Sequence, residues 1–376
     1  MTLRFNIKTQ AFLKPSNNKP ILIIANSGRM LAETACRAGF KPWVVDLFAD
    51  QDTRQLSEQT FRVESLAPSF LETIVADFKS RHANSPVTYG SGLEHHPESL
   101  EMIGRECELL GNDIETVLQL HPKKRFFECL DRLKIQYPYV VFAEPATCER
   151  WLIKPETGEG GLNIRWFHTG IPIEPDTYWQ KYIEGTTCSA LFLADGRNFQ
   201  TIGFHTQWSE NLDTDKPFLF AGVINRSPLS SEQKLRVHSW IGSIMQQIPL
   251  KGLNTIDFIV KDGQIYMLEL NPRPSASMQL YDGDLFKAHI NACRGILDDT
   301  KFANDPVCAY RILYADQKIA IPENFCWPKA CRDLPIAGSI IRKGQPICSI
   351  IARDINVRNV HRQLNEVRQT IIQSFN

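Results

Sequence analysis

The feature that most constrains this 376-residue chain is a pair of short apolar runs near residue 260. Residues 256–260 and 265–270 are mostly apolar, and they flank the dipeptide Asp262-Gly263. An Asp-Gly pair between two such runs is a strong β-hairpin signal. We therefore expect two antiparallel strands joined by a tight turn.

Three side chains that can bind a metal ion interrupt this hairpin: Asp257, Glu269 and Asn271. Successive side chains on a strand alternate between faces, so Glu269 and Asn271 point the same way. Asp257 joins them only if the connecting loop has an odd number of residues, and we expect a three-residue loop with Gly263 in the left-handed conformation. Because buried unpaired carboxylates are costly, the trio predicts a cation site. Oxygen ligands favour Mg²⁺ or Mn²⁺ over zinc.

Arg273 lies two residues beyond Asn271. Its guanidinium can reach a phosphate that the metal also contacts. In the alternative interpretation, Glu269 and Asn271 are solvated polar groups at an ordinary strand end. That alternative explains neither Asp257 nor Arg273, so the metal site is the favoured prediction.

Composition indicates a globular protein of two or three lobes. Forty-two basic and 42 acidic residues balance, which leaves no basic surplus for nucleic acid or anionic lipid. The first residues contain no signal-peptide core, and no apolar run is long enough to span a bilayer, so we expect a cytoplasmic location. The ten cysteines form no Cys-x-x-Cys pair and complete no zinc pattern, which favours reduced thiols.

The N-terminal part predicts a βαβ unit with a parallel sheet. An apolar run at residues 20–25 is followed by a helical stretch to Ala38 and a second strand at 42–46. No Gly-x-Gly-x-x-Gly motif is present, so a nicotinamide site is not expected. Residues 66–82 predict a helix, and a strand from Val87 runs into Gly90-Ser91-Gly92. That glycine loop is either a structural turn or a substrate loop.

A second cluster suited to phosphate follows the predicted strand at residues 151–155. Lys154 leaves that strand six residues before Gly160-Gly161, and Gly158 precedes them. Glycines let backbone N–H groups approach phosphate oxygens, and a lysine adds a point charge. The segment lacks the Gly-Lys-Ser/Thr of a P-loop. With a return strand beginning at residue 163, it predicts a lid.

Taken in order over roughly residues 20–300, these motifs resemble the ATP-grasp superfamily, on its branch of carboxylate–amine ligases. The resemblance implies an α/β protein of ATP-grasp fold, with an N-terminal βαβ (pre-ATP-grasp) domain and a small β-rich C-terminal module. The domains expected are 1–120 (N-terminal), 121–187 (small lobe), 188–305 (large lobe with the metal hairpin) and 306–376 (a packing module that ends in an amphipathic helix).

The same resemblance assigns the nucleotide site. A basic residue opening the helix after residue 122, Lys124 or Arg125, reaches the α-phosphate. Many relatives carry a ribose-binding acid where this chain has Thr187, so a ribose role for Glu184 is left open. The residues expected to contact ATP are Lys124, Arg125, Lys154, Gly158, Gly160, Gly161, Gln180, Lys181, Tyr182, Ile183 and Glu184.

The activity implied is that of an ADP-forming carbon–nitrogen ligase, with ATP and Mg²⁺ or Mn²⁺. A carboxylate becomes an acyl phosphate, and an amine displaces the phosphate. Lys154 and Arg273 are the expected catalytic residues, and Ser91 and Arg273 are expected to face the acid. The partners are a small-molecule carboxylate and an amine, without nucleic acid or membrane, and the resemblance allows a homodimer.

Segments 90–94, 110–112, 189–196 and 271–277 are similar to a narrower subgroup, the tyramine–glutamate ligases of methanofuran-type cofactor synthesis in one-carbon metabolism. Two other functions stay open. ATP-grasp lobes can serve as regulatory nucleotide-binding modules without chemistry, and Thr187 is consistent with that. The second of these alternatives is a phosphotransferase that stops at the phosphorylated product.

Overall fold

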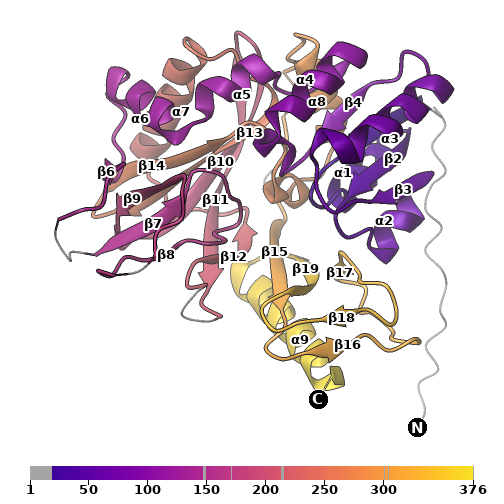
Figure 1. The fold of residues 1–376 in the computed structure, drawn as a ribbon. Helices are drawn as coiled ribbons and strands as arrows, with labels where there is room; N and C mark the ends of the chain where they lie inside the picture. Colours follow the sequence, from indigo (N-terminus) through magenta and orange to yellow (C-terminus); the bar gives the residue numbers. More distant parts are fainter. Residues whose placement is uncertain are drawn as a thin grey trace.

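The computed structural model describes residues 19–146, 150–170, 172–212, 216–299, 301–303 and 305–375. Residues 1–18 of the first predicted domain lie outside this range. Figure 1 shows the indigo N-terminal domain on one side, two lobes in magenta to salmon on the other, and a yellow C-terminal helix below. The protein mixes parallel and antiparallel sheets with helices, which confirms the predicted α/β class.

The N-terminal domain is built on a five-stranded parallel sheet in the order β3-β2-β1-β4-β5. Its strands are β1 Lys19–Ile24, β2 Phe40–Asp46, β3 Gln59–Arg62, β4 Val87–Tyr89 and β5 Leu109–Leu110. Alternate side chains of β1 enter two different cores, Ile21 and Ile23 on one face and Leu22 and Ile24 on the other. Burial on both faces is typical of a parallel strand and explains why this run is continuously apolar.

Helices cover this sheet. The predicted βαβ unit is confirmed as β1, α1 and β2, and the helix predicted at 66–82 is α3. The strand predicted from Val87 ends after three residues, and a 3₁₀ turn at Leu93–His95 follows the glycine loop. The helices are α1 Arg29–Arg37, α2 Gln51–Leu56, α3 Pro68–Arg81, α4 Pro97–Glu106 and α5 Ile114–Leu120.

The next lobe combines helix α6 (Lys123–Arg132) with a four-stranded antiparallel sheet in the order β6-β9-β7-β8. The strands are β6 Val140–Val141, β7 Trp151–Pro155, β8 Arg165–Trp166 and β9 Thr177–Lys181. Because β7 pairs with β8, the glycine-rich segment between them forms a connection at one end of the sheet. That is the place predicted for the lid.

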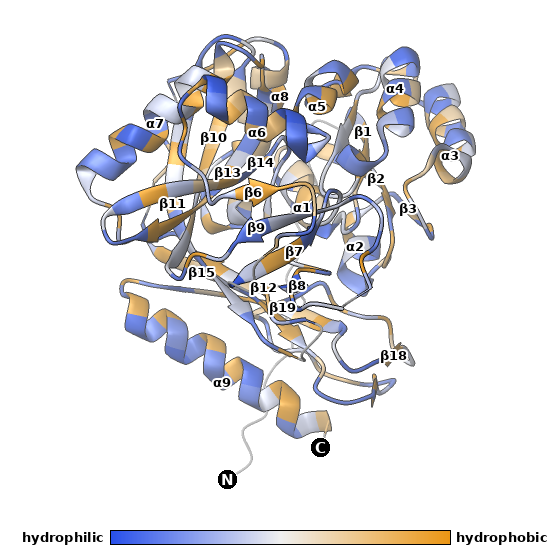
Figure 2. Cartoon of the chain, turned by 60° about the vertical axis from the view of Figure 1, so that its left-hand side comes forward, coloured by the Kyte–Doolittle hydropathy of each residue, from blue (hydrophilic) through white to orange (hydrophobic). Residues whose placement is uncertain are grey.

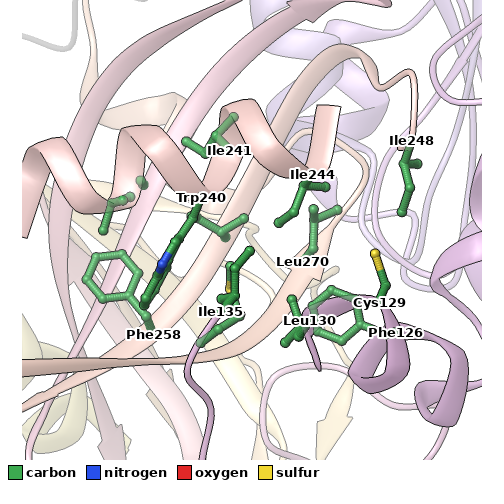
Figure 3. Close-up of a cluster of buried hydrophobic side chains, with 14 of the residues drawn as sticks. Phe126, Cys129, Leu130, Ile135, Trp240, Ile241, Ile244, Ile248, Phe258 and Leu270 are labelled. Carbon is green, nitrogen blue, oxygen red and sulfur yellow. The ribbon is translucent and has the colours of Figure 1, made fainter. Parts of the chain in front are cut away.

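The second lobe is the main part of an eight-stranded antiparallel sheet in the order β14-β13-β10-β11-β12-β15-β19-β17. Its strands are β10 Thr186–Asp195, β11 Phe199–Glu210, β12 Leu219–Ile224, β13 Lys251–Lys261 and β14 Gln264–Asn271, and its helices are α7 Ser231–Met245 and α8 Leu285–Cys293. Figure 3 shows Trp240 and Ile244 of α7 packed beside Phe258 and Leu270 of the hairpin and Phe126 of α6. This core fixes the hairpin against α6.

The C-terminal segment continues the large sheet, since β15 pairs with β12 of the preceding lobe. The segment contains β15 Val307–Tyr314, β16 Ile319–Ala320, β17 Cys331–Arg332, β18 Ile340–Ile341, β19 Pro346–Asp354 and α9 Val357–Phe375. The predicted terminal amphipathic helix is α9, whose alternating apolar and polar faces are visible in Figure 2. Its buried residues Val360, Leu364 and Ile371 share a core with β15 and β19.

Ion pairs connect this segment to the N-terminal domain. Arg29 of α1 is only 1% exposed and contacts Asp333 at 2.9 Å. The carboxylate of Asp52 accepts hydrogen bonds from the backbone N–H groups of Asp333 and Leu334, both at 2.9 Å. Across the described ranges, no helix has the length and apolar character needed to traverse a bilayer.

Candidate active site

The predicted hairpin forms from β13 and β14, with Asp262 and Gly263 alone in the turn. Both have positive φ, +48° and +77°, as a tight hairpin turn requires. The expected three-residue loop is therefore wrong. The register instead shifts between Asp257 and Phe258, so that Leu268 is an extra residue on β14. This β-bulge does what the odd loop was expected to do, because it pairs Asp257 directly with Glu269.

The three predicted metal ligands lie together. Asn271 Nδ2 is 3.0 Å from Asp257 Oδ2 and 3.4 Å from Glu269 Oε1. Gln207 of β11 donates to Asp257 Oδ1 at 2.9 Å. Gln207 was not predicted, because nothing in the pattern of β11 sets it apart.

The two carboxylates influence each other. Burial and the charge of Glu269 raise the pKa of Asp257. Burial also acts to raise the pKa of Glu269, but Lys123 and Lys154 outweigh it, so that pKa is lowered. Two facing half-buried carboxylates are stable as anions only beside positive charge. Among the described residues no cluster of three or more His, Cys, Asp or Glu is placed to hold a metal, so a cation here would rely on two carboxylates and an amide. That oxygen-only set fits Mg²⁺ or Mn²⁺ once the Asn271 amide turns its oxygen inward.

The basic residue at the start of α6 that contacts the site is Lys123, and the predicted role of Lys124 or Arg125 finds no supporting contact. Lys123 Nζ lies 3.7 Å from Glu269 Oε2, whereas Lys124 and Arg125 are exposed. Arg125 donates instead to the backbone oxygen of Leu118. Helical spacing explains the difference, since Lys123 shares the inward face with Phe126 and Phe127, three and four residues on.

Lys154 is buried behind the carboxylates. Its Nζ donates to Gln180 Oε1 at 3.2 Å, and burial lowers its pKa, partly opposed by the charge of Glu269. Lys154 and Lys123 therefore supply two positive charges that act on Glu269. Such charges can neutralise phosphate oxygens.

Most of the predicted site residues line one cavity of about 540 Å³ between the lobes. Gly158, Glu184, Lys124 and Arg125 are not among its lining residues. The predicted residues that do line it are Ser91, Lys154, Gly160, Gly161, Gln180, Lys181, Tyr182, Ile183, Asp257, Glu269, Asn271 and Arg273.

The cavity is also lined by residues 180–183, which are expected to contact ATP. The N–H of Lys181 is bonded to the carbonyl of Tyr139, and that of Tyr182 to the carbonyl of Arg150. Glu184 pairs with Arg150 on the exposed surface, while Thr187 lines the cavity. A ribose role for Glu184 therefore has no support in this geometry.

The glycine lid is docked against the second lobe. Gly160 and Gly161 have φ of +60° and +73°, and the N–H of Phe220 donates to the Gly160 carbonyl at 2.8 Å. A Cβ on Gly161 would lie 1.9 Å from the Phe218 carbonyl oxygen, so only glycine allows this approach. Between Gly158 and Gly160, the carboxylate of Glu159 accepts a hydrogen bond from the side chain of Asn26 in the N-terminal domain and lies 3.9 Å from Arg273.

Arg273 is 10% exposed and donates through Nε to Glu94 at 2.6 Å, and Glu94 is itself 3% exposed. Burial acts to raise the pKa of Glu94, but the charges of Arg273 and His95 and the hydrogen bond from Arg273 together outweigh it and lower that pKa. Arg273 also donates through Nη2 to Asn271 Oδ1 at 3.3 Å. Glu94 was not predicted, although it follows the glycine loop that carries Ser91.

Comparison with known proteins agrees with this arrangement. Residues 121–277 match the ATP-grasp domain family. An uncharacterized protein of Methanocaldococcus jannaschii is 26% identical over 275 residues, which cover 67% of this chain and 65% of that protein. The chain thus spans just under two thirds of that relative's length.

Two solved structures illustrate the similarity of fold. The N5-carboxyaminoimidazole synthetase of Staphylococcus aureus, complexed with ADP, aligns with a TM-score of 0.70 at 14% identity, covering 94% of this chain and 98% of that one. The biotin carboxylase domain of Hydrogenobacter thermophilus 2-oxoglutarate carboxylase, with MgADP and bicarbonate, gives 0.70 at 15% identity, covering 89% and 86%. Residues 121–277 therefore match the ATP-grasp domain family, and the chain shares its fold with these two structures.

Proposed function

We propose that this protein is an ATP-dependent ligase that forms an amide between a carboxylate and an amine and releases ADP. The observation that carries the proposal is the pairing of Asp257 with Glu269 across the bulge, with Lys123, Lys154 and Arg273 around them. A module that only binds a nucleotide needs neither a pair of metal-binding carboxylates nor an arginine that contacts the third ligand, Asn271.

Each residue has a role that its position supports. Asp257, Glu269 and Asn271 hold Mg²⁺ or Mn²⁺, which when bound neutralises charge on the phosphates. Lys123 and Lys154 hold phosphate oxygens. Gly160 and Gly161 let backbone N–H groups approach the same oxygens. Arg273 stabilises negative charge on the phosphoryl group during transfer. Ser91 lines the same cavity and lies on the side proposed for the acid.

Phosphorylation activates the acid because a carboxylate is a poor electrophile. The carboxylate oxygen attacks the terminal phosphorus, ADP leaves, and an acyl phosphate forms. The amine then attacks the acyl carbon, phosphate leaves and the amine loses a proton. The protein contributes alignment and charge neutralisation. We propose glutamate and tyramine-like amines as the first pair to test, within one-carbon carrier synthesis.

The test is ADP release measured across amino acids with and without added amines. We expect release that depends on both, and oxygen-18 from the carboxylate should appear in inorganic phosphate. Label in AMP would indicate an adenylate and contradict the proposal. ADP release that ignores the amine would indicate a phosphotransferase, and nucleotide binding without any turnover would indicate a regulatory module.

Glu269→Ala is the matched variant. It should retain the fold, because Glu269 is part-buried at a cavity wall, and lose ATP turnover. Unchanged turnover in a folded Glu269→Ala protein would remove the metal assignment.

A further inference from the structure

The lid carries two carboxylates that the roles above do not use, Glu156 and Glu159, and of these Glu159 lines the cavity. It stands between glycines and lines the central cavity with its side chain 25% exposed. Its hydrogen-bond partner among the described residues is the neutral amide of Asn26, and Arg273 lies beyond hydrogen-bond distance at 3.9 Å. Glu159 is therefore a charge facing the cavity.

The positive charge nearest to Glu159 is Arg273, which already forms an ion pair with Glu94. Arg273 donates to Glu94 at 2.6 Å, and both side chains are at most 10% exposed. The charge of Arg273 lowers the pKa of Glu94, so Glu94 is ionised beside it. Arg273, Glu94 and Glu159 together therefore carry one surplus negative charge, and the exposed member of the three is Glu159.

That surplus decides which chemical group the subsite accepts. A substrate carboxylate that approaches Arg273 also approaches Glu159, and the two anions repel each other in a site partly closed to water. An ammonium group on the same substrate, placed beside Glu159 while the carboxylate lies beside Arg273, offsets this repulsion because each substrate charge then faces an opposite charge. Primary amines are protonated at neutral pH and have the hydrogen-bond donors that a carboxylate and an amide oxygen accept.

We propose that Glu159, with Asn26, binds a substrate ammonium group and so sets the substrate specificity of the site. The inference rests on the proposed ligase function, and it deepens it by adding a cationic requirement. Two sources share this chemistry, the α-ammonium of an amino-acid substrate and the acceptor amine. Either places the ammonium next to the group that Arg273 contacts.

A lid latch is the competing role. Glu159 joins the lid to the N-terminal domain through Asn26, and the side chain of Asn26 in turn packs over Gly92, where a Cβ would lie 2.3 Å from it. A residue that only latches the lid would alter lid motion without discriminating between amines and their neutral analogues. The experiment therefore measures both lid motion and the discrimination between amines and their neutral analogues.

Isothermal titration calorimetry in the presence of MgADP would first rank the twenty amino acids and a set of primary amines that includes tyramine. The tightest binder is then compared with its analogue lacking the amino group, for example glutamate with glutarate or tyramine with 4-ethylphenol. We expect the wild-type chain to favour the ammonium compound at least tenfold, and Glu159→Gln to abolish this preference. Glu159→Asp should restore part of it. Glu174→Gln, which removes an exposed carboxylate outside the cavity, should leave it intact.

The amino-acid pair and the amine pair identify which ammonium the site holds. The inference is overturned if the wild-type chain binds no ammonium compound, or if Glu159→Gln speeds hydrogen exchange in residues 156–162 while the preference persists. If ammonium compounds bind but no acid and amine together release ADP, the ligase proposal fails and the subsite stands.

Discussion

Lys123 and Lys124 are neighbours in sequence, but only Lys123 contacts a residue of the site, at 3.7 Å from Glu269. The choice between them depends on where α6 begins, and an apolar pattern locates a helix end only to within a few residues. Residues predicted from motifs do line the cavity where the strand fixes the direction of the side chain, as it does for Lys154 and Glu269. Glu94 could not be predicted, because its partner Arg273 is 179 residues away.

The two lysines give a matched pair of variants. We expect Lys123→Met to lower kcat/KM for ATP roughly 100-fold, since a single charged contact to a reacting phosphate is typically worth two to three orders of magnitude. Lys124→Met removes the same charge from the exposed face and should leave kcat/KM within about twofold. Steady-state ADP release measures both. Equal losses in the two variants would contradict the placement of Lys123.

Asp50 offers a test of pH dependence. Burial, followed by the charges of Asp333, Asp46 and Asp52, raises its pKa to about 8. The folded protein therefore holds a proton on Asp50 that the unfolded chain releases near pH 4. The resulting stability is complete below pH 4 and is lost as pH rises toward 8. Asp50→Asn cannot ionise, so its Tm should match wild type near pH 4 and exceed it increasingly up to pH 8. A Tm difference that is the same at every pH would contradict this assignment.

At the scale of elements, local patterns predicted the hairpin of β13 and β14 but not its register. The Asp262-Gly263 turn is a local signal, whereas the bulge at Leu268 reflects the packing of Met267 and Phe258 into the same core. The lid was likewise predicted from its glycines. Its docking against Phe218 and Phe220 could not be, because those residues lie in a different lobe.

Variants of two glycines distinguish the effect of a left-handed backbone conformation from the effect of lid docking. Gly161 and Gly170 both have positive φ, but a Cβ would meet the Phe218 oxygen at 1.9 Å only at Gly161, and nothing within 4 Å at Gly170. Gly161→Ala should therefore speed hydrogen exchange across residues 156–162 and lower ATP turnover about tenfold or more. Gly170→Ala should cost only about 1 kcal/mol of stability, the usual penalty for the left-handed region.

In the wild-type chain, exchange of the same segment should slow when MgATP is added. If Gly170→Ala changed turnover as much as Gly161→Ala, general strain would explain the effect and the docking of the lid would not.

On the scale of the whole molecule, the C-terminal segment packs against both the second lobe and the N-terminal domain. A β-rich C-terminal module was predicted, but the pairing of its strand β15 with β12 was not, because pairing between distant strands leaves no local pattern. The buried contact of Arg29 with Asp333 is a second link between segments far apart in sequence. It makes the N-terminal domain and the C-terminal segment depend on each other for stability.

Arg29→Met tests that dependence. The variant leaves Asp333 buried without its cation, which typically costs about 3–5 kcal/mol. Arg294→Met breaks an exposed pair with Glu108 at 2.7 Å and should cost at most about 1 kcal/mol. Urea unfolding followed by tryptophan fluorescence measures both free energies. Similar small costs in the two variants would show that the buried pair does not couple the segments.

The C-terminal strands also form a wall of the cavity, to which Tyr310, Tyr314 and Pro346 contribute. These residues lie beyond the stretch 121–277 that matches the ATP-grasp domain family, and Ser91 lies before it. The cavity wall is thus shared between the matched stretch, which carries Glu159 and Arg273, and the two segments that flank it. Substitutions confined to the flanking segments can reshape the cavity without touching any residue of the matched domain.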